Sequence, residues 1–152
     1  MAELSHVSPE GHARMVDTSA KSETARAATA RGLVKLSPGT LPRILSGDLP
    51  KGPVLECARA AAILAAKQTP SLIPMCHPLR LTSVAVSFEP KGPDALGIEA
   101  TVSAVDRTGV EMEALVAVAV AALTVYDMVK AVDRGVSITD VVLVSKTGGK
   151  SG

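Results

Sequence analysis

The chain has 152 residues, of which 47% are hydrophobic and 1% are aromatic, and its formal net charge is +1 at pH 7. This length and composition fit a single domain whose core is built from aliphatic side chains. With no tryptophan, one tyrosine and a charge near zero, a protein that binds nucleic acid through stacked bases or a basic surface is not expected.

Cysteine content and the N-terminal sequence indicate in which cellular compartment the protein is found. Cys57 and Cys76 are two thiols outside any recognised motif, and the N-terminus lacks the hydrophobic stretch that a signal peptide needs. Both observations favour a reducing cytoplasm.

The first segment of the chain is mostly small and polar. We expect residues 1–23 to form a mobile N-terminal arm. Residues 24–152 show no repeat or low-complexity segment and are expected to fold as one domain. A strand that carries Arg26 is predicted over residues 24–36.

Helices and prolines shape the next part of the chain. A short helix is predicted over residues 40–47 and an alanine-rich helix over residues 54–67, with Lys51 in the loop between them. Residues 69–78 contain three prolines. We expect these prolines to exclude a helix and to hold His77 in a rigid loop.

Alternating patterns predict three further strands, over residues 81–89, 96–106 and 137–145. A long helix is predicted over residues 108–135, before the last strand. The order β, α, β, β, α, β, with the short helix as an addition, predicts a ferredoxin-like α+β domain. Such a domain is an antiparallel sheet with helices packed on one face.

Sequence signals bound the long helix at both ends. Thr108 and Glu111 fit a capping box, and Gly135 fits the left-handed residue at which many helices end. These bounds predict a helix about 39 Å long. Residues 114–125 are almost wholly apolar, so the helix must be covered all round, yet the run is too short to span a bilayer. We therefore expect a sheet on one side and a second subunit on the other.

Ionisable side chains in this apolar helix are candidates for chemistry. Glu113 and Asp127 point within about 40° of each other but lie about 21 Å apart along the helix axis. They serve either the two ends of a long ligand or two sites completed by different subunits. Asp127 and Lys130 are three residues apart and can pair. On a surface helix such a pair is usually structural, whereas ionisable groups in an apolar setting are more often functional.

The adjacent Cys76 and His77 suggest a metal site at first sight. Neighbouring residues rarely both reach one ion, and no other His or Cys cluster accompanies them, so no metal is expected. A histidine held by prolines suits a proton donor or a substrate contact. On these residues alone, a loop histidine that bonds its own backbone explains the pattern equally well.

Residues 146–152 place Lys146 and Lys150 beside glycines without forming a Walker motif, because Val144 stands where that motif needs glycine. The segment can still bind an anion. Lys150 is interpreted as part of a solvated tail, and Lys146, at a strand end, is the better candidate.

Four basic and two acidic side chains together suit a polyphosphorylated substrate and proton-transfer chemistry. They are Arg26, Lys51, Lys130 and Lys146 against Glu113 and Asp127.

Five segments in chain order carry a family resemblance. They are MVDTSAK (15–21), LIPMCHPL (72–79), TGVEMEAL (108–115), YDMVKAV (126–132) and KTGGKSG (146–152). Together they resemble the MoaC family, the cyclic pyranopterin monophosphate synthases of molybdenum cofactor biosynthesis. One departure is Met75, where the family often has an aliphatic residue, and methionine preserves an apolar contact there.

The resemblance implies a lyase that acts on (8S)-3',8-cyclo-7,8-dihydroguanosine 5'-triphosphate. The product is cyclic pyranopterin monophosphate, and pyrophosphate is released. It also implies a hexamer, built as a trimer of dimers with sites between subunits. Composition, charge and the length of the apolar run had already indicated that neither nucleic acid nor a membrane is a partner. No cofactor is implied, and the sequence neither requires nor excludes Mg²⁺.

Site residues follow from the resemblance position by position. Asp127, Lys51 and Lys130 fall on catalytic positions, and we interpret them as proton shuttles during ring opening and reclosure. Arg26, His77 and Lys146 would hold the triphosphate. The full set of substrate-binding positions is Met75, Cys76, His77, Met112, Glu113, Lys146 and Arg26.

A non-catalytic, nucleotide-sensing ferredoxin-like oligomer is the alternative, and a nucleotide-binding scaffold subunit is a third interpretation. Both explain the aliphatic core and the fold, but neither explains acids and lysines set into the apolar helix. Release of pyrophosphate from the cyclised GTP derivative distinguishes the enzyme from both.

Overall fold

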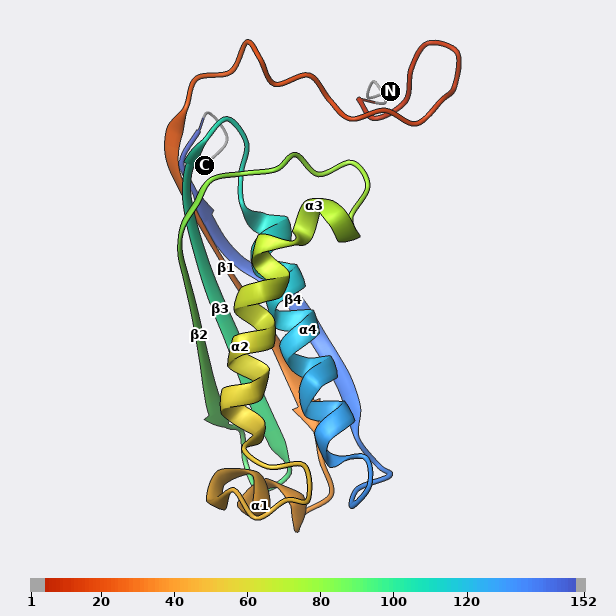
Figure 1. Cartoon of the computed structure of the whole chain (residues 1–152), viewed down its shortest axis with the longest axis vertical. Coiled ribbons are helices and arrows are strands. Elements are labelled where there is room, and N and C mark those ends of the chain that lie inside the picture. Colours follow the sequence, from red (N-terminus) through yellow and green to blue (C-terminus); the bar gives the residue numbers. More distant parts are fainter. Residues whose placement is uncertain (1–4, 150–152) are drawn as a thin grey trace.

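The computed structural model describes residues 5–149 and confirms the predicted ferredoxin-like α+β architecture (Figure 1). A sheet carries helices on one face, and a short helix is added after the first strand. The elements are β1 (Thr24–Lys35), α1 (Thr40–Ser46), α2 (Val54–Lys67), α3 (Thr69–Leu72), β2 (Leu81–Pro90), β3 (Ala95–Asp106), α4 (Glu111–Val129) and β4 (Ser137–Thr147).

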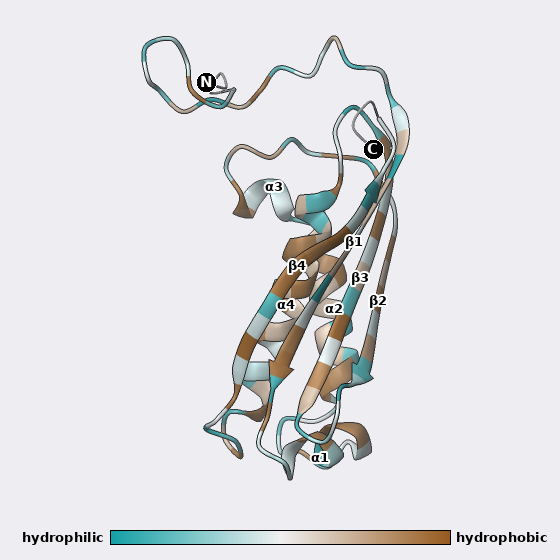
Figure 2. Cartoon of the chain, turned by 180° about the vertical axis from the view of Figure 1, so that it is seen from behind, coloured by the Kyte–Doolittle hydropathy of each residue, from teal (hydrophilic) through white to brown (hydrophobic). Residues whose placement is uncertain are grey.

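The four strands form one sheet in the order β2-β3-β1-β4, with every neighbouring pair antiparallel. The helices α2 and α4 pack side by side on one face, and Figure 2 shows the other face of the sheet without helices. Each long helix links two strands that flank a third, as two split β-α-β units require.

Small residues bring the sheet and the helices close together. Gly32 on β1 faces α4, where a Cβ would lie only 2.7 Å from Val118 Cγ1, so a larger residue would push the helix away. The two helices meet through alanines, which allow close packing. The predicted aliphatic core is confirmed, and its alanines on the two helices include Ala58, Ala62, Ala66, Ala114, Ala117 and Ala121.

The long helix is shorter than the sequence signals indicated. α4 has 19 residues, which makes it about 28 Å long rather than about 39 Å. The predicted capping box of Thr108 and Glu111 is wrong, because the residue at the cap position is Val110, whose buried side chain anchors the helix start without a hydrogen bond. The predicted end at Gly135 is also wrong, since the helix ends at Val129.

Among the described residues, α4 alone is long and apolar enough to cross a membrane, by length and composition. The apolar part of α4 is therefore longer than residues 114–125, the stretch from which the sequence analysis excluded a membrane span. Its burial against α2 and the sheet accounts for that composition as a core helix. One flank stays open, where Leu123 is 58% exposed and Tyr126 is 41% exposed.

The proline-rich segment contains a helical turn that the sequence analysis excluded. α3 covers Thr69–Leu72 and has Pro70 in its first turn, where a backbone N–H needs no intrahelical partner. Thr69 is buried and donates its hydroxyl to the Ala65 carbonyl, which joins α3 to the end of α2. Proline therefore starts a helix here, and the rigid loop begins only after α3.

The strand β4 lies at an edge of the sheet and pairs only with β1. Its register with β1 shifts between Arg31 and Leu33, and Asp140 there has a φ of 56°. Such a bulge bends and twists an edge strand. The residues after the bulge are apolar and exposed: Val141, Val142, Leu143 and Val144.

A buried carboxylate ties the segment before α1 to the segment after α4. Asp133 is 3% exposed and accepts hydrogen bonds from Ser37 N (2.8 Å), Ser37 Oγ (2.8 Å), Thr40 Oγ1 (2.7 Å) and Gly135 N (2.9 Å). Burial by itself would raise the pKa of Asp133, but these bonds outweigh burial and hold that pKa below its usual value. The charged carboxylate thus joins parts of the chain 96 residues apart.

Asp133→Ala should lower the free energy of unfolding by about 2–4 kcal/mol at pH 7, measured by urea denaturation, because buried donors lose their acceptor. Because folding lowers the pKa of Asp133, its contribution is present above the unfolded pKa and lost as the pH falls. The two proteins should therefore converge in acid. Asp48→Ala is the matched control, since that side chain is 81% exposed. Equal losses in both variants would contradict the assignment.

Candidate active site

Three charged side chains meet at the C-terminal end of α4, and we call Lys51, Asp127 and Lys130 the acid–amine cluster. Asp127 Oδ1 lies 2.9 Å from Lys130 Nζ, and its Oδ2 lies 3.3 Å from Lys51 Nζ. The Lys51 ammonium also donates to the Asp127 carbonyl at 3.0 Å, one of the carbonyls that a helix end leaves without an intrahelical partner. The predicted pairing of Asp127 with Lys130 is confirmed.

The cluster is charged and open to solvent in a single chain. The exposed fractions of the Lys51, Asp127 and Lys130 side chains are 42%, 58% and 56%. Hydrogen bonds from Lys130 and then Lys51, together with their charges, lower the pKa of Asp127, so this carboxylate is ionised at neutral pH. Exposed ion pairs add little to stability. A contribution to the stability of the fold therefore does not explain why these three charged side chains are grouped.

The N-terminal end of α4 borders a cavity of about 370 Å³, which we call the loop pocket. It lies between the helix start, the proline-rich loop and the N-terminal arm. The structure brings five of the predicted substrate-binding residues to its wall: Met75, Cys76, His77, Met112 and Glu113. The remaining lining residues are Ser5, His6, Val16, Thr18, Lys21, Leu79, Thr108, Gly109 and Glu111.

The loop pocket holds a carboxyl group that keeps its proton to near-neutral pH. Glu113 is 3% exposed, and burial raises its pKa to about 7, while its own backbone N–H lowers it and the Glu111 charge raises it. Burial, and then the charges of Glu113 and Glu111, raise the pKa of the Cys76 thiol. At pH 7 the wall therefore offers a carboxyl group that can give or take a proton, beside a protonated thiol.

Glu111, which the sequence analysis assigned to helix capping, lines the loop pocket. Its Oε1 lies 3.8 Å from Lys146 Nζ, and its buried Oε2 has no hydrogen-bond partner among the described residues. A buried carboxylate oxygen without a partner is costly. The ion pair places Lys146, at the end of β4, beside the loop pocket.

Arg26 lies at the same end of the molecule but is engaged with backbone. Its Nε donates to the Asp106 carbonyl at 3.0 Å, and its Nη2 donates to the Arg107 carbonyl at 3.2 Å. These bonds hold the guanidinium where β3 ends. Arg26 does not line the loop pocket, and Lys150 lies outside the described residues.

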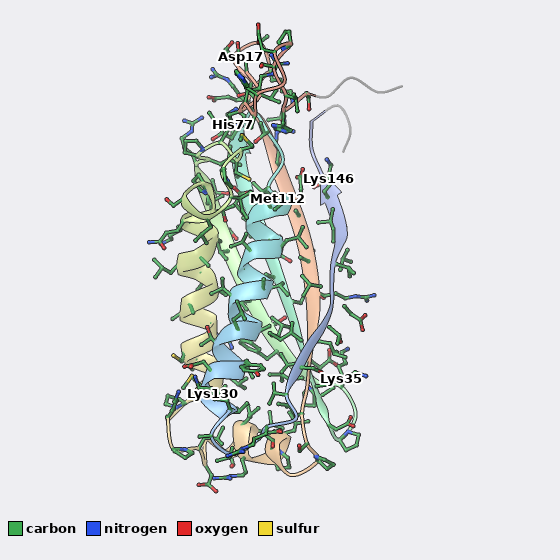
Figure 3. All side chains as sticks on the ribbon, turned by 90° about the vertical axis from the view of Figure 1, so that its right-hand side faces the viewer. Asp17, Lys35, His77, Met112, Lys130 and Lys146 are labelled. Carbon is green, nitrogen blue, oxygen red and sulfur yellow. The ribbon has the colours of Figure 1, made fainter. Side chains whose placement is uncertain are left out.

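The predicted site residues fall into two groups at opposite ends of the molecule. Figure 3 shows His77, Met112 and Lys146 toward one end and Lys130 toward the other. Along α4, the rise from Glu113 to Asp127 is about 21 Å. Within residues 5–149 the two groups therefore do not meet in one small site, as the spacing of Glu113 and Asp127 along the helix predicted.

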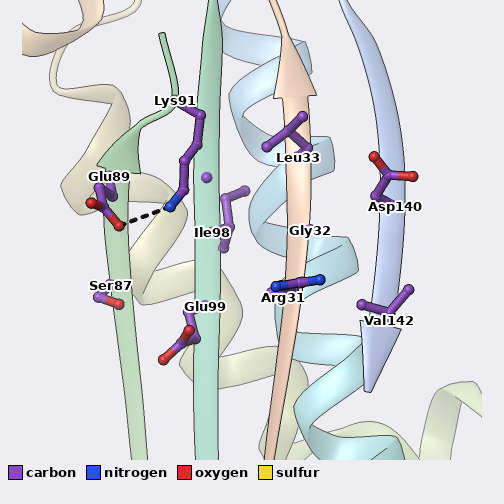
Figure 4. Close-up of a pocket in the computed structure, with 11 residues that line it drawn as sticks. Arg31, Gly32, Leu33, Ser87, Glu89, Lys91, Ile98, Glu99, Asp140 and Val142 are labelled. Atoms are coloured by element: carbon purple, nitrogen blue, oxygen red, sulfur yellow. Dashed lines mark hydrogen bonds and ion pairs between the residues drawn. The ribbon is translucent and has the colours of Figure 1, made fainter. Parts of the chain in front are cut away.

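A hollow of about 450 Å³ lies elsewhere, on the face of the sheet that carries no helices (Figure 4). Arg31 and Glu99 border it, and Lys91 Nζ pairs with Glu89 Oε2 at 3.1 Å. None of the predicted site residues lines it. No group of three or more His, Cys, Asp or Glu side chains within residues 5–149 is placed to hold a metal ion.

The chain matches known proteins over nearly its whole length. A model of the MoaC family matches residues 15–149. A cyclic pyranopterin monophosphate synthase from Desulfitobacterium hafniense is 57% identical over 150 residues, covering 99% of this chain and 92% of the relative. A protein of the same name from Thermomicrobium roseum is 58% identical over 153 residues, covering 100% of this chain and 92% of the relative. Cyclic pyranopterin monophosphate synthase 3 from Mycobacterium tuberculosis is 57% identical and covers 98% and 84%.

Glu113→Gln should remove a pH dependence of stability. Unfolded Glu113 ionises near 4.5, whereas in the folded chain it keeps its proton to about pH 7. The folded state therefore binds more protons in this interval, and the free energy of unfolding falls as the pH rises. Relative to Glu113→Gln, wild type should lose about 1–2 kcal/mol between pH 5 and pH 8, allowing for screening by water in the pocket. The exposed Glu56, changed to Gln, is the control; parallel curves for wild type and Glu113→Gln would contradict the raised pKa.

Proposed function

The chain belongs to the MoaC family, and we propose that it acts as a cyclic pyranopterin monophosphate synthase, a lyase of molybdenum cofactor biosynthesis. The substrate is the cyclised GTP derivative (8S)-3',8-cyclo-7,8-dihydroguanosine 5'-triphosphate, and the products are cyclic pyranopterin monophosphate and pyrophosphate. The observation that carries this proposal is the identity of 57% to a relative of that name over 99% of this chain.

The active site forms where two copies of the chain meet. Because each chain holds the acid–amine cluster and the loop pocket at opposite ends of α4, two chains lying side by side in opposite directions bring the cluster of one to the pocket of the other. The exposed Leu123 and Tyr126 on α4 support a contact along this helix. The assembly is a hexamer, a trimer of such dimers, as the family resemblance implies.

In the composite site, the acid–amine cluster moves protons and the other groups hold the substrate. Contact with the second chain removes water from Lys51 and Lys130 and places both amines beside the substrate. Asp127 fixes both amines within hydrogen-bond reach. His77, Lys146 and Arg26 bind the triphosphate and screen the charge that develops on the leaving pyrophosphate. The contacts to the ring portion come from Met75, Cys76, Met112 and Glu113.

Side chains of the protein catalyse the reaction without a resident cofactor. The enzyme works in the reducing cytoplasm. The donor set of the composite site consists of amines, carboxyl groups and a histidine, which suits proton transfer. Assays after dialysis against EDTA, with and without added Mg²⁺, measure whether the triphosphate needs a metal ion.

Asp127→Asn and Lys51→Ala should each reduce turnover roughly 10²- to 10⁴-fold, because each removes a group that carries or positions a proton. Pyrophosphate release from the cyclised GTP derivative measures turnover, and light scattering should show an unchanged assembly. Lys67→Ala, an exposed lysine at the end of α2, is the control. Near-normal turnover by either cluster variant would refute the assignment.

Mixed assemblies test whether two chains share the site. Asp127→Asn disables the cluster and His77→Ala disables the pocket, so each protein alone should be inactive. A mixed dimer has one intact site out of two. Random mixing of equal amounts should therefore restore about a quarter of the wild-type activity.

The control for this experiment mixes Asp127→Asn with Lys51→Ala. Both substitutions lie in the cluster, so every site in the mixed dimer is damaged and no activity should return. If the first mixture also stays inactive although the chains exchange, the two ends do not serve one site.

A further inference from the structure

A buried carboxylate lies just behind the acid–amine cluster without belonging to it. Asp133 follows Lys130 by three residues, in the segment that leads from α4 to β4. Its two oxygens accept hydrogen bonds from Ser37, Thr40 and Gly135 rather than from the amines of the cluster. The proposed reaction gives this side chain no direct part, so its relation to the cluster has to be sought through the backbone.

Asp133 fixes the turn that carries Lys130. The Asp133 N–H donates to the Val129 carbonyl at 2.9 Å, and Asp133 Oδ1 accepts from Gly135 N at 2.9 Å. The Lys130 N–H donates to the Tyr126 carbonyl at 3.0 Å. Lys130 therefore lies between the last residue of α4 and a residue that hydrogen bonds hold on both sides.

The same carboxylate fixes the start of α1, which lies at the same end of the molecule as the C-terminal end of α4 (Figure 1). Asp133 Oδ2 accepts from Ser37 N at 2.8 Å and from Thr40 Oγ1 at 2.7 Å. Thr40 is the first residue of α1 and is 5% exposed. Hydrogen bonds to a charged group are short and directional, whereas apolar contacts have no preferred direction. Asp133 thus sets where α1 begins relative to the end of α4.

From α1 the chain leads directly to Lys51. The Asp48 N–H donates to the Arg43 carbonyl at 3.0 Å, which closes the end of α1. Leu49 is buried, and its carbonyl accepts from Gly52 N at 3.0 Å, so Lys51 lies within a closed turn. A shift of α1 would therefore be passed on to the backbone that carries the Lys51 amine.

We propose that Asp133 is a positioning residue for the acid–amine cluster: by joining α1 to the turn after α4, it holds Lys51 beside Asp127. This inference rests on the proposed function, which assigns proton transfer to the cluster. Asp133 touches neither the substrate nor the reacting atoms and acts through Lys51. The ion pair of Lys51 with Asp127 is exposed and holds its partners only weakly, so the backbone beneath Lys51 has to be placed by other contacts.

Thr40→Val tests the proposal, because it removes one donor to Asp133 while the Ser37 N–H keeps its bond to the same oxygen. Misplacement of the Lys51 amine should lower kcat for pyrophosphate release roughly tenfold. KM should stay within about twofold of wild type, since the loop pocket lies at the other end of α4. Thr40→Ser keeps the hydroxyl and should restore kcat, and Asp133→Asn should lower kcat at least as much as Thr40→Val does.

The same substitution in a chain that carries Lys51→Ala separates positioning from a general loss of stability. If Asp133 acts through Lys51, Thr40→Val should change single-turnover pyrophosphate release less than about twofold in this background. A loss of stability alone would lower turnover by the same factor in both backgrounds. Equal losses in the two backgrounds, or a normal kcat for Thr40→Val alone, would overturn the proposal.

Thr101→Val is the matched control, because it makes the same exchange on β3, where the hydroxyl lies 2.8 Å from Thr29 Oγ1. Its kcat should stay within about twofold of wild type. If wild type releases no pyrophosphate, the proposed function fails, and crystal structures of wild type and Thr40→Val still test the positioning. The distance from Lys51 Nζ to Asp127 Oδ2, 3.3 Å here, should exceed about 4 Å in the variant; an unchanged distance would show that Asp133 does not place Lys51.

Discussion

The burial of α4 is the constraint on which the organisation of this protein depends. Val118, Val125 and Val129 are fully enclosed by the sheet and α2, and a helix packed in this way cannot bend to bring its ends together. The acid–amine cluster and the loop pocket are therefore held at a fixed separation. This rigidity prevents the two groups from meeting in one small site within residues 5–149.

The two ends of α4 also differ in their protonation. At one end, two ammonium groups keep the Asp127 carboxylate ionised. At the other, burial keeps Glu113 largely protonated below about pH 7. A site assembled from both ends would combine groups that give protons with groups that take them, as reactions that move protons at several atoms require. Burial raises the pKa at one end, and ion pairing lowers it at the other.

Local sequence signals predicted the parts of the fold that local physics controls. The alanine-rich helix over residues 54–67 and the four strands follow from periodicity, and their order gave the ferredoxin-like topology. The ends of α4 were wrong because tertiary contacts decide them: Val110 is anchored in the core and Asp133 binds segments distant in sequence. α3 was missed because proline was treated only as a helix breaker. For the candidate site, helix geometry alone predicted that Glu113 and Asp127 lie far apart. The pairing of Glu111 with Lys146 needed the spatial position of β4.

The exposed edge of β4 has a consequence for aggregation. After its bulge, this strand presents Val141, Val142, Leu143 and Val144 beside backbone groups that have no neighbouring strand among residues 5–149. An apolar edge of this kind is a template for pairing with any extended chain. A contact that covered this edge would therefore lower the tendency of the chain to aggregate.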